Sequence, residues 1–486
     1  MSLIRLLPAC AVPLLGGMAL LAACAPVPDL GAAPRPLAAG SIMATQSFAA
    51  GETAWPQAGW WQAYGDAQLS ALIDEGLKGA PDLAAAAARL RKADALAQQA
   101  GAALLPSLDA SASGGWAKQS YNNGIPPAFV PRGWQDNGRA ALDLGLDLDL
   151  WGRNRAALRA ATSDAAAARI ELEEARLVLS TNIAAAYADL ARLFAERDVQ
   201  QSALRVRSET LALVANRVAT GLDTQAELKQ AEAAVPAARA DVAATDEAIA
   251  LTRNRLAALI GAGPDRGLTI ERPATPALGG RGLPPGVTTD LIGRRPDVAA
   301  ARARVEAAAA RIKVARADFY PAVNLSAMIG LQSLGIDNLV KSGSSIGSVG
   351  PAISLPIFHG GELAGRYKGA RADYDQAVAS YDGSVVEAYH QVADAVTSQR
   401  SLAVRLDETR RALASSEQAY AVARQRYEGG LSTFLDVLSA EDAVLLNRRI
   451  VADLEARAFT LDVALVRALG GGFATNDIIA KENDDG

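Results

Sequence analysis

Residues 142–150 read Leu-Asp-Leu-Gly-Leu-Asp-Leu-Asp-Leu, a regular alternation of apolar and polar side chains. Successive side chains of a β-strand point to opposite faces, so leucine would occupy one face and Asp143, Asp147 and Asp149 the other. Segments of about ten residues with this pattern are typical of outer-membrane barrel strands, whose polar face lines a lumen. We therefore predict pore-lining roles for the three aspartates. The predicted strands lie near residues 106–118, 138–150, 321–333 and 345–357.

The N-terminus carries an export signal that ends at a cysteine. Arg5 lies in a short leading segment, an apolar run continues to Ala23, and small residues stand directly before Cys24. This pattern is a lipobox, in which the signal is cut before the cysteine and the cysteine carries lipid. The run is too short and too interrupted by proline for a transmembrane helix. We predict lipidation at Cys24 rather than an ordinary cleaved signal, and Ala25 indicates the outer membrane.

The strand pattern has a second interpretation, because a soluble sheet with one dry face shows the same alternation. The export signal favours the membrane interpretation. Four strands are too few to close a barrel around a lumen, and open sheet edges are not tolerated in lipid. Several copies of the chain must then complete the barrel. Three copies would give twelve strands, which lies within the bacterial range.

The sequence contains an internal repeat. Pro81–Leu83 returns as Pro296–Val298, and Gly221-Leu222 returns as Gly430-Leu431. Such matches keep their order along the chain and include proline and glycine, so one unit of about two hundred residues occurs twice. Each copy is expected to contain a helix, two strands and two long helices.

Long stretches without glycine or proline predict long helices. Residues 153–220 contain neither, and a helix over Arg153–Arg217 would be roughly 98 Å long at about 1.5 Å per residue. Many alanines allow close packing on a second side, which a ring of helices needs and a two-stranded rod does not. Apolar residues recur along this helix at coiled-coil spacing: Ile183, Tyr187, Leu190 and Phe194.

These features predict an α+β membrane protein. The predicted segments are a signal peptide at 1–23, a lipidated Pro-rich linker at 24–59, repeat 1 at 60–270, repeat 2 at 271–470 and a flexible acidic tail at 471–486.

Composition and motifs argue against several other functions. The formal charge is −5 and no basic stripe stands out, so nucleic acid is not an expected partner. Neither His359 nor His390 lies near a plausible nucleophile in sequence, and the chain has no Gly-rich phosphate loop or metal-ligand spacing. Cys10 leaves with the signal, so no free thiol remains beside the lipidated cysteine. We expect no enzyme activity, no cofactor and no metal site.

Four stretches resemble the outer-membrane factor family of tripartite efflux systems. They are Trp60–Asp66, Arg294–Pro321, Leu355–Gly361 and Arg426–Leu438. The resemblance implies a homotrimer in outer-membrane lipid. Its expected form is a trimeric twelve-stranded β-barrel, with four strands per chain, that continues into a long periplasmic α-helical barrel. Its implied partners are a periplasmic adaptor (a membrane fusion protein) and an inner-membrane pump, expected to be of RND type. The duct would be a passive channel for drugs or other small molecules, opened by contact with adaptor and pump.

Other functions were weighed against this one. The outer-membrane duct of a type I protein secretion system remains an alternative. A structural coiled-coil periplasmic lipoprotein would explain the helices but not the alternating strands. A lipoprotein hydrolase would need a nucleophile motif, and we find none in the sequence.

The resemblance also assigns roles to the tips of the two helical hairpins. Gly221-Leu222 and Gly430-Leu431 are expected to make the turns and to receive the hairpins of the adaptor. Glycine permits the reversal of the chain at such a turn. The helices behind the tips would constrict to close the tunnel.

Three residues near the tips correspond to a periplasmic gate of the family. Three copies of Asp436 around an axis would form an anionic ring that binds cations. Tyr427 corresponds to a gate tyrosine, and Glu227 is its expected acidic partner. An arginine that often helps to lock the gate is replaced by Ser432, so the resemblance implies a weaker lock.

Overall fold

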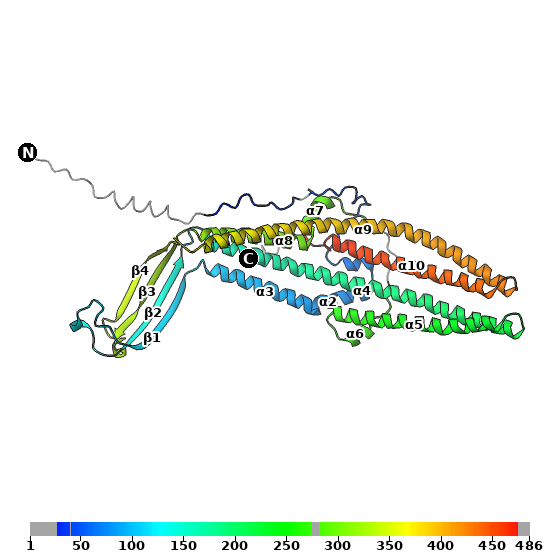
Figure 1. Cartoon of the computed structure of the whole chain (residues 1–486), viewed down its shortest axis with the longest axis horizontal. Coiled ribbons are helices and arrows are strands. Elements are labelled where there is room, and N and C mark those ends of the chain that lie inside the picture. Colours follow the sequence, from blue (N-terminus) through cyan, green and yellow to red (C-terminus); the bar gives the residue numbers. More distant parts are fainter. Residues whose placement is uncertain (1–26, 39, 275–280, 475–486) are drawn as a thin grey trace, which may run out of the picture. The chain divides into compact units, whose positions relative to one another are not determined.

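The computed structural model describes residues 27–38, 40–274 and 281–474, so the signal peptide, Cys24 and most of the predicted tail lie outside the described residues. The described chain forms two compact units (Figure 1). With the gaps just given, the first comprises residues 27–35, 91–167 and 302–380, and the second comprises residues 36–90, 168–301 and 381–474.

The first unit contains an antiparallel sheet of four strands in chain order. They are β1 (Ser107–Ala117), β2 (Gln135–Asp147), β3 (Ala322–Leu334) and β4 (Ser345–Ser354). The register aligns the alternation across the sheet, with one row of Leu108, Leu144, Ala327 and Val349 and the next of Asp109, Asp143, Met328 and Ser348. Because successive rows point to opposite faces, one face is apolar and the other is largely polar.

Two strands end earlier than the alternation predicts. β2 starts and stops three residues before the expected 138–150, and β4 stops at Ser354 rather than at residue 357. Asp147 turns its carboxylate to the next helix, and Asp149 has a φ of 44°, which a strand does not allow. Pro356 offers no N–H for a ladder hydrogen bond. The extension of both strands was therefore wrong.

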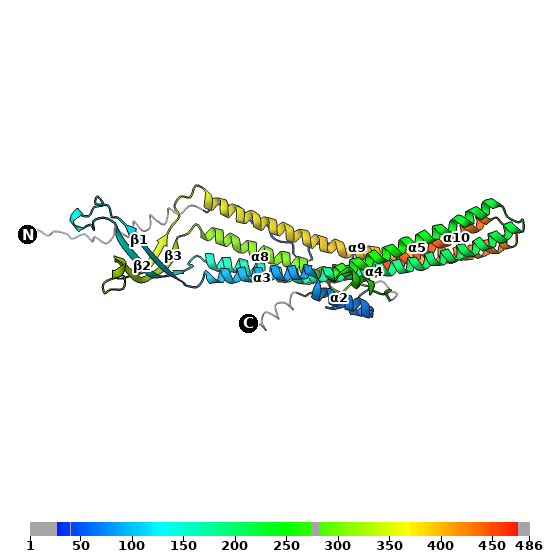
Figure 2. The ribbon, with the colours of Figure 1, turned by 90° about the horizontal axis from the view of Figure 1, so that it is seen from below.

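The two halves of the chain contain helices of equal length. The pairs are α3 (Pro81–Ala102) and α8 (Pro296–Ala317) with 22 residues each, α4 (Arg153–Ala219) and α9 (Glu362–Glu428) with 67 each, and α5 (Gln225–Leu259) and α10 (Phe434–Ala468) with 35 each. α4 and α5 form one hairpin, and α9 and α10 form the other (Figure 2). Proline opens α3 and α8, at a position that needs no N–H donor.

Shorter elements connect these helices. They are η1 (Trp60–Tyr64), α2 (Ala67–Gly79), η2 (Pro127–Phe129), α6 (Pro264–Leu268), α7 (Val287–Arg294) and η3 (Ile336–Asn338). Pro236 lies inside α5, where the missing N–H removes one helical hydrogen bond. Among the residues that the structure describes, no helix combines the length and the apolar character needed to cross a membrane.

The main apolar core of the second unit includes the middle of α4. The coiled-coil stripe predicted there is buried, which confirms its role in packing: Ile183, Tyr187, Leu190 and Phe194. The same cluster includes Leu69, Leu72 and Ile73 of α2, Leu256 of α5 and Val466 of α10. Elements from both repeats therefore share one core.

Two buried tyrosines fasten the segment around η1 to this core. Tyr64 donates to Asp462 of α10 at 2.6 Å, and Asp462 forms an ion pair with Arg281 at 2.7 Å. Tyr187 of α4 donates to Asp66 at 2.7 Å. Burial, followed by the adjacent carboxylate, raises the pKa of each tyrosine. Both hydroxyl groups therefore remain donors, and the buried carboxylates keep their partners.

An extended segment near the N-terminus, residues 27–38, lies against α9. In the first unit, Arg371 donates to the carbonyl oxygens of residues 31 and 32, at 3.4 and 2.6 Å. Tyr374 donates to the carbonyl oxygen of Pro34 at 3.2 Å. We name residues 27–38 the N-terminal strap. Its backbone carbonyls are satisfied by side chains of α9 rather than by secondary structure.

Candidate functional site at the hairpin tips

Both hairpins of the second unit turn through the same backbone motif. Gly221 and Gly430 have φ angles of 75° and 73°, a left-handed conformation that glycine adopts without a steric penalty. The N–H groups of Leu222 and Leu431 each bond at 2.8 Å to a carbonyl oxygen of the last helical turn. Their side chains are 66% and 72% exposed. The four predicted tip residues thus lie at two exposed turns.

The helix that follows each turn begins with a capping box. The N–H of Thr224 donates to Glu227 at 2.5 Å, and the N–H of Thr433 donates to Asp436 at 2.9 Å. The backbone hydrogen bond from Thr433, followed by that from its side chain, lowers the pKa of Asp436 below its ordinary value. Glu227 and Asp436 therefore occupy equivalent capping positions in the two hairpins.

A partly buried cluster joins the two hairpins beside the turns. Tyr427 of α9 is 1% exposed and donates its hydroxyl hydrogen to Asp223, which lies between α4 and α5. Arg217 of α4 forms a bidentate ion pair with Asp223 at 2.9 and 3.2 Å. Its guanidinium donates to the carbonyl oxygen of Tyr427 at 3.0 Å and lies 4.4 Å from the centroid of the Tyr427 ring. We name Arg217, Asp223 and Tyr427 the hairpin lock.

The charges of the hairpin lock support one another. Burial by itself would raise the pKa of Asp223, but the hydrogen bonds from Arg217 and Tyr427 outweigh it and leave the pKa below its ordinary value. Burial, followed by the hydrogen bond to Asp223, raises the pKa of Tyr427. Phe434 and Val437 belong to the apolar cluster around the tyrosine. The lock therefore consists of a charged pair and a neutral phenol in a largely dry setting.

The predicted pairing of Tyr427 with Glu227 was wrong. Glu227 lies inside the first turn of α5 and caps that helix, whereas Asp223 lies in the turn and reaches the tyrosine. The cation of the lock is Arg217 of α4, which belongs to the same hairpin as Asp223. The hydroxyl of Ser432, where an arginine was expected by resemblance, donates to the carbonyl oxygen of Ala423 at 3.4 Å.

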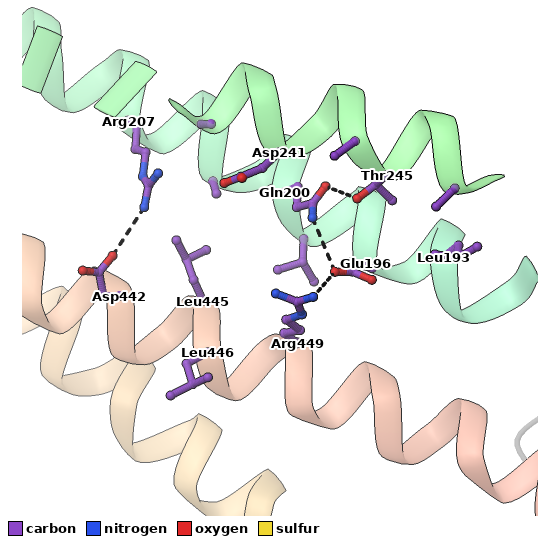
Figure 3. Close-up of a pocket in the computed structure, with 15 residues that line it drawn as sticks. Leu193, Glu196, Gln200, Arg207, Asp241, Thr245, Asp442, Leu445, Leu446 and Arg449 are labelled. Atoms are coloured by element: carbon purple, nitrogen blue, oxygen red, sulfur yellow. Dashed lines mark hydrogen bonds and ion pairs between the residues drawn. The ribbon is translucent and has the colours of Figure 1, made fainter. Parts of the chain in front are cut away.

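A groove of about 470 Å³ lies farther along α4, α5 and α10 (Figure 3). The buried Glu196 of α4 forms an ion pair with Arg449 of α10 at 2.7 Å. Thr245 of α5 donates to Gln200 of α4 at 2.7 Å. These contacts connect α4 to both neighbouring helices. In the described part of the chain, no group of three or more His, Cys, Asp or Glu side chains could hold a metal ion.

Comparison with known proteins decides the family. The model of the family "Outer membrane efflux protein" matches residues 72–262 and 287–471, which is more than half of the chain and includes both repeats. The chain belongs to the outer membrane efflux protein family.

Relatives of this efflux protein include solved and curated proteins. The crystal structure of the outer membrane protein VceC from Vibrio cholerae is 47% identical, with a TM-score of 0.82, and the match covers 86% of this chain and 100% of that one. Multidrug resistance outer membrane protein MdtP of Escherichia coli is 30% identical over 96% of this chain and 97% of its own length. Fusaric acid resistance protein FusA of Burkholderia cepacia is 34% identical, but the match covers 66% of this chain and 61% of FusA.

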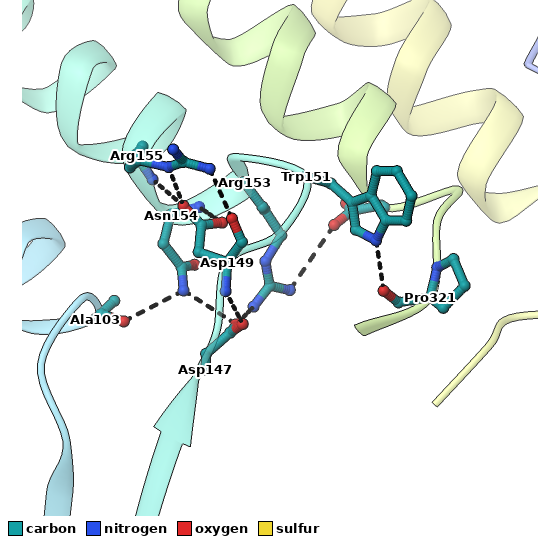
Figure 4. Close-up of polar contacts among 9 residues, drawn as sticks. Ala103, Asp147, Asp149, Trp151, Arg153, Asn154, Arg155 and Pro321 are labelled. Atoms are coloured by element: carbon teal, nitrogen blue, oxygen red, sulfur yellow. Dashed lines mark hydrogen bonds and ion pairs between the residues drawn. The ribbon is translucent and has the colours of Figure 1, made fainter. Parts of the chain in front are cut away.

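The three acids predicted to line the pore of this efflux protein have different surroundings. Asp143 lies within β2 and accepts a hydrogen bond from a serine of β1 at 3.2 Å. Asp147 ends β2 and accepts hydrogen bonds from Arg153 and Asn154 (Figure 4). Asp149 lies beyond the strand, and its carboxylate accepts from the N–H groups of residues 154 and 155 at the start of α4. The strand argument for Asp149 therefore fails.

Sequence reasoning missed two members of the hairpin lock, Arg217 and Asp223. Their counterparts in the second repeat are Arg426 and Ser432, so the turn acid of this efflux protein occurs in the first copy alone. That asymmetry was a usable signal. The second hairpin turns without an acid at this position. The acid in the first copy is therefore not required for the turn and can contact the other hairpin.

Proposed function

We propose that this protein is the outer-membrane duct of a tripartite, RND-type efflux system and carries drugs or other small molecules passively from the periplasm to the exterior. Family membership over both repeats carries the proposal, and the similarity to the outer membrane protein VceC supports it. MdtP and FusA are named for resistance to multiple drugs and to fusaric acid. These names favour small-molecule cargo over the protein cargo of a type I secretion duct.

We infer that the four-stranded sheet lies in the outer membrane as part of a β-barrel. Exposed apolar side chains follow one face of the sheet: Leu108, Leu144, Ile329, Val349 and Ile353. Exposed aromatic side chains occur at both ends of the strands, with Trp116 and Trp134 beside the β1–β2 connection and Trp151 and Phe358 beyond β2 and β4. An apolar band between two aromatic girdles is a feature of outer-membrane barrels.

The open edges of the sheet support a homotrimer. β1 and β4 each have one neighbour, so each leaves a row of backbone N–H and C=O groups without a strand partner among the described residues. Such groups cost several kcal/mol each in lipid. In the proposed trimer, β4 of one copy pairs with β1 of the next, which closes twelve strands. The helices of the three copies would form the periplasmic tunnel.

The N-terminal strap supports a fixed lipid anchor. In the proposed mature protein, residues 1–23 are removed and Cys24 carries lipid. Two residues then separate Cys24 from the start of the strap at residue 27. Arg371 and Tyr374 of α9 hold the strap at residues 32 and 34. The anchor would therefore enter outer-membrane lipid close to the point where the strap begins.

The hairpin lock is the proposed periplasmic gate. Opening it breaks the contacts that Tyr427 of α9 makes with Asp223 and Arg217 of the other hairpin, so opening needs an input of free energy, which contact with the adaptor and pump would supply. The exposed Leu222 and Leu431 at the tips are proposed to contact the adaptor. Asp436, exposed at the start of α10, is proposed to form an anionic ring in the trimer.

Reconstitution into planar lipid bilayers tests the duct. Purified protein should insert and produce discrete steps of conductance, and adaptor together with pump should raise the open fraction. A preparation that binds membranes through its lipid but never conducts would contradict the duct and favour a structural periplasmic lipoprotein.

A further inference from the structure

A basic cleft opens where the sheet of the first unit meets its helices. Its volume is about 530 Å³, and it is lined by the start of α4, the end of α8 and the aromatic residues Trp151 and Tyr320. The cationic side chains of the lining are Arg155, Arg159, Lys313 and Arg316. The described lining contains no carboxylate. A volume of this size is within the range of about 300–1,000 Å³ that small ligands occupy.

Three of the four cations are uncompensated. Arg155 pairs with Asp149 at 3.0 Å (Figure 4). The exposed side chains of Arg159, Lys313 and Arg316 make no hydrogen bond or ion pair with any other described residue. Three positive charges around one small cleft repel one another, so an anion that enters it gains attraction from all three.

Two carboxylates close in sequence to the cleft residues of α4 and α8 are already engaged. Asp164 of α4 forms an ion pair with Arg311, and Asp318, at the end of α8, lies 3.8 Å from Arg153. Neither can turn to the cleft without leaving another cation behind. The positive charge of the cleft is therefore a fixed property of this unit.

The aromatic pair fixes the character of the cleft. Trp151 is 52% exposed and stacks on Tyr320, with ring centroids 4.8 Å apart. Its indole N–H donates to the carbonyl oxygen of Pro321 at 2.7 Å (Figure 4). Trp151 follows the last residue of β2 by four positions. Exposed tryptophan and tyrosine at the end of a barrel strand are typical of the headgroup level of a membrane.

We propose that the basic cleft binds the phosphate of an anionic phospholipid of the inner leaflet, of the phosphatidylglycerol or cardiolipin type. Guanidinium and ammonium groups bind phosphate oxygens through charge-assisted hydrogen bonds. The stacked aromatic pair packs against the glycerol region, and the acyl chains continue along the apolar face of the strands. The proposal rests on the proposed barrel, because that barrel brings the end of β2 to the membrane surface.

Native mass spectrometry of detergent-purified protein tests the site. Wild-type protein is titrated with phosphatidylglycerol and with zwitterionic phosphatidylcholine of the same chains. We expect saturable adducts with the anionic lipid, about a hundredfold weaker adducts in the variant Arg159→Gln/Lys313→Gln/Arg316→Gln, and none specific to phosphatidylcholine. Inorganic phosphate should not displace the lipid at millimolar concentration if the headgroup binds together with its glycerol and chains.

The matched control is Arg91→Gln/Lys92→Gln/Lys368→Gln, which removes three exposed cations of the same unit from α3 and α9. It carries the same change in net charge and should retain lipid binding. An equal loss of lipid binding in both variants would show an effect of net charge alone and would overturn the proposed site. Unchanged lipid binding in the cleft variant, with altered anion selectivity of the channel, would overturn it in favour of a cleft that faces the lumen.

Conductance of the same preparations separates this proposal from the duct itself. A wild-type protein that conducts but shows no preference for anionic lipid contradicts the lipid site alone. A wild-type protein that binds anionic lipid with the expected preference but never conducts contradicts the duct alone. The cleft variant should still conduct, because its three residues lie in α4 and α8 and not in the sheet.

Discussion

Asp223 is the residue on which the contact between the hairpins depends. It accepts from both Arg217 and Tyr427, so its removal leaves a partly buried cation and a buried phenol without their shared partner. Arg217 and Asp223 are only partly buried, so the loss of their pair should cost less than the roughly 3–5 kcal/mol of a fully buried pair. Loss of the Tyr427 hydroxyl alone removes one hydrogen bond to a charged group, which contributes about 1.5–3 kcal/mol. Removal of the Asp223 carboxylate should therefore weaken the lock more than loss of the Tyr427 hydroxyl.

Resting conductance in planar bilayers should follow that order. Tyr427→Phe should raise it moderately and Asp223→Ala strongly, because the second change also releases Arg217. Glu227→Ala is the matched control, since it removes an acid of the same turn that contacts only its own helix cap. If Glu227→Ala opens the channel as much as Asp223→Ala, the lock is not the gate.

The pKa directions predict how the gate responds to pH. The pKa of Asp223 is lowered, so the lock contributes stability above the ordinary aspartate value of about 3.9 and loses it as pH falls through the lower pKa of the folded state. The pKa of Tyr427 is raised, so alkaline opening is not expected below the ordinary tyrosine value of about 10. Single-channel recordings from pH 5 to 9 should show a constant resting conductance. A titration step inside that window would contradict the lock.

Asp436 should control block by divalent cations. Asp436→Ala is expected to weaken block from the periplasmic side, because three carboxylates around one axis would be lost. Both Asp436 and Glu227 cap a helix, so Glu227→Ala reproduces the loss of a cap without the proposed ring. Equal effects of the two substitutions on the block would assign it to helix fraying.

At the scale of elements, the register of β2 decides which of its side chains face lipid in the proposed barrel. Leu144 and Asp143 are neighbours in sequence, but Leu144 belongs to the apolar row and Asp143 to the polar one. The register is shared with β1 and β3, so neither residue can change face without a slip of the whole strand. A charge introduced at these two positions therefore meets different surroundings.

Leu144→Arg should impair assembly far more than Asp143→Arg. An arginine on the lipid face near mid-membrane costs about 2–4 kcal/mol, and a trimer would carry three. Asp143→Arg instead places a cation in the lumen and should reduce cation preference. The yield of heat-resistant oligomer and the reversal potential measure the two effects. Equal yields of both variants would contradict the assignment of the two faces.

Elements were predictable where one local rule decides them. Strand alternation, the glycine-free run from residue 153 and the glycines at both tips each correspond to elements of the structure. The ends of β2 and β4 were not, because the hydrogen bonds of Asp147 and Asp149 to the start of α4 and the missing N–H of Pro356 decide them. Contacts between distant segments, such as Tyr427 with Asp223 or Tyr64 with Asp462, follow from packing that no local pattern contains.

At the scale of the whole molecule, lipidation and assembly are separable. We expect Cys24→Ser to leave an unprocessed or unlipidated chain, because the proposed lipid is attached to the cysteine sulfur. Trimers should still form, since strand pairing does not involve the anchor. Mass spectrometry of the mature N-terminus and native mass spectrometry of the oligomer measure these two outcomes. An unmodified N-terminus elsewhere in the wild-type protein would contradict the anchor, and monomers alone would contradict the homotrimer.

The equal lengths of α4 and α9 constrain how the gene can change. Arg217 and Tyr427 meet near the ends of two helices of 67 residues each, so the loss of one turn from α4 alone would shift Arg217 by about 5.4 Å along its axis. Such a deletion breaks the contact between Arg217 and Tyr427 unless a deletion of the same size also occurs in α9. Insertions and deletions in these helices should therefore accumulate in pairs among descendants of the ancestral duplication, while the loops that join the strands drift in length independently.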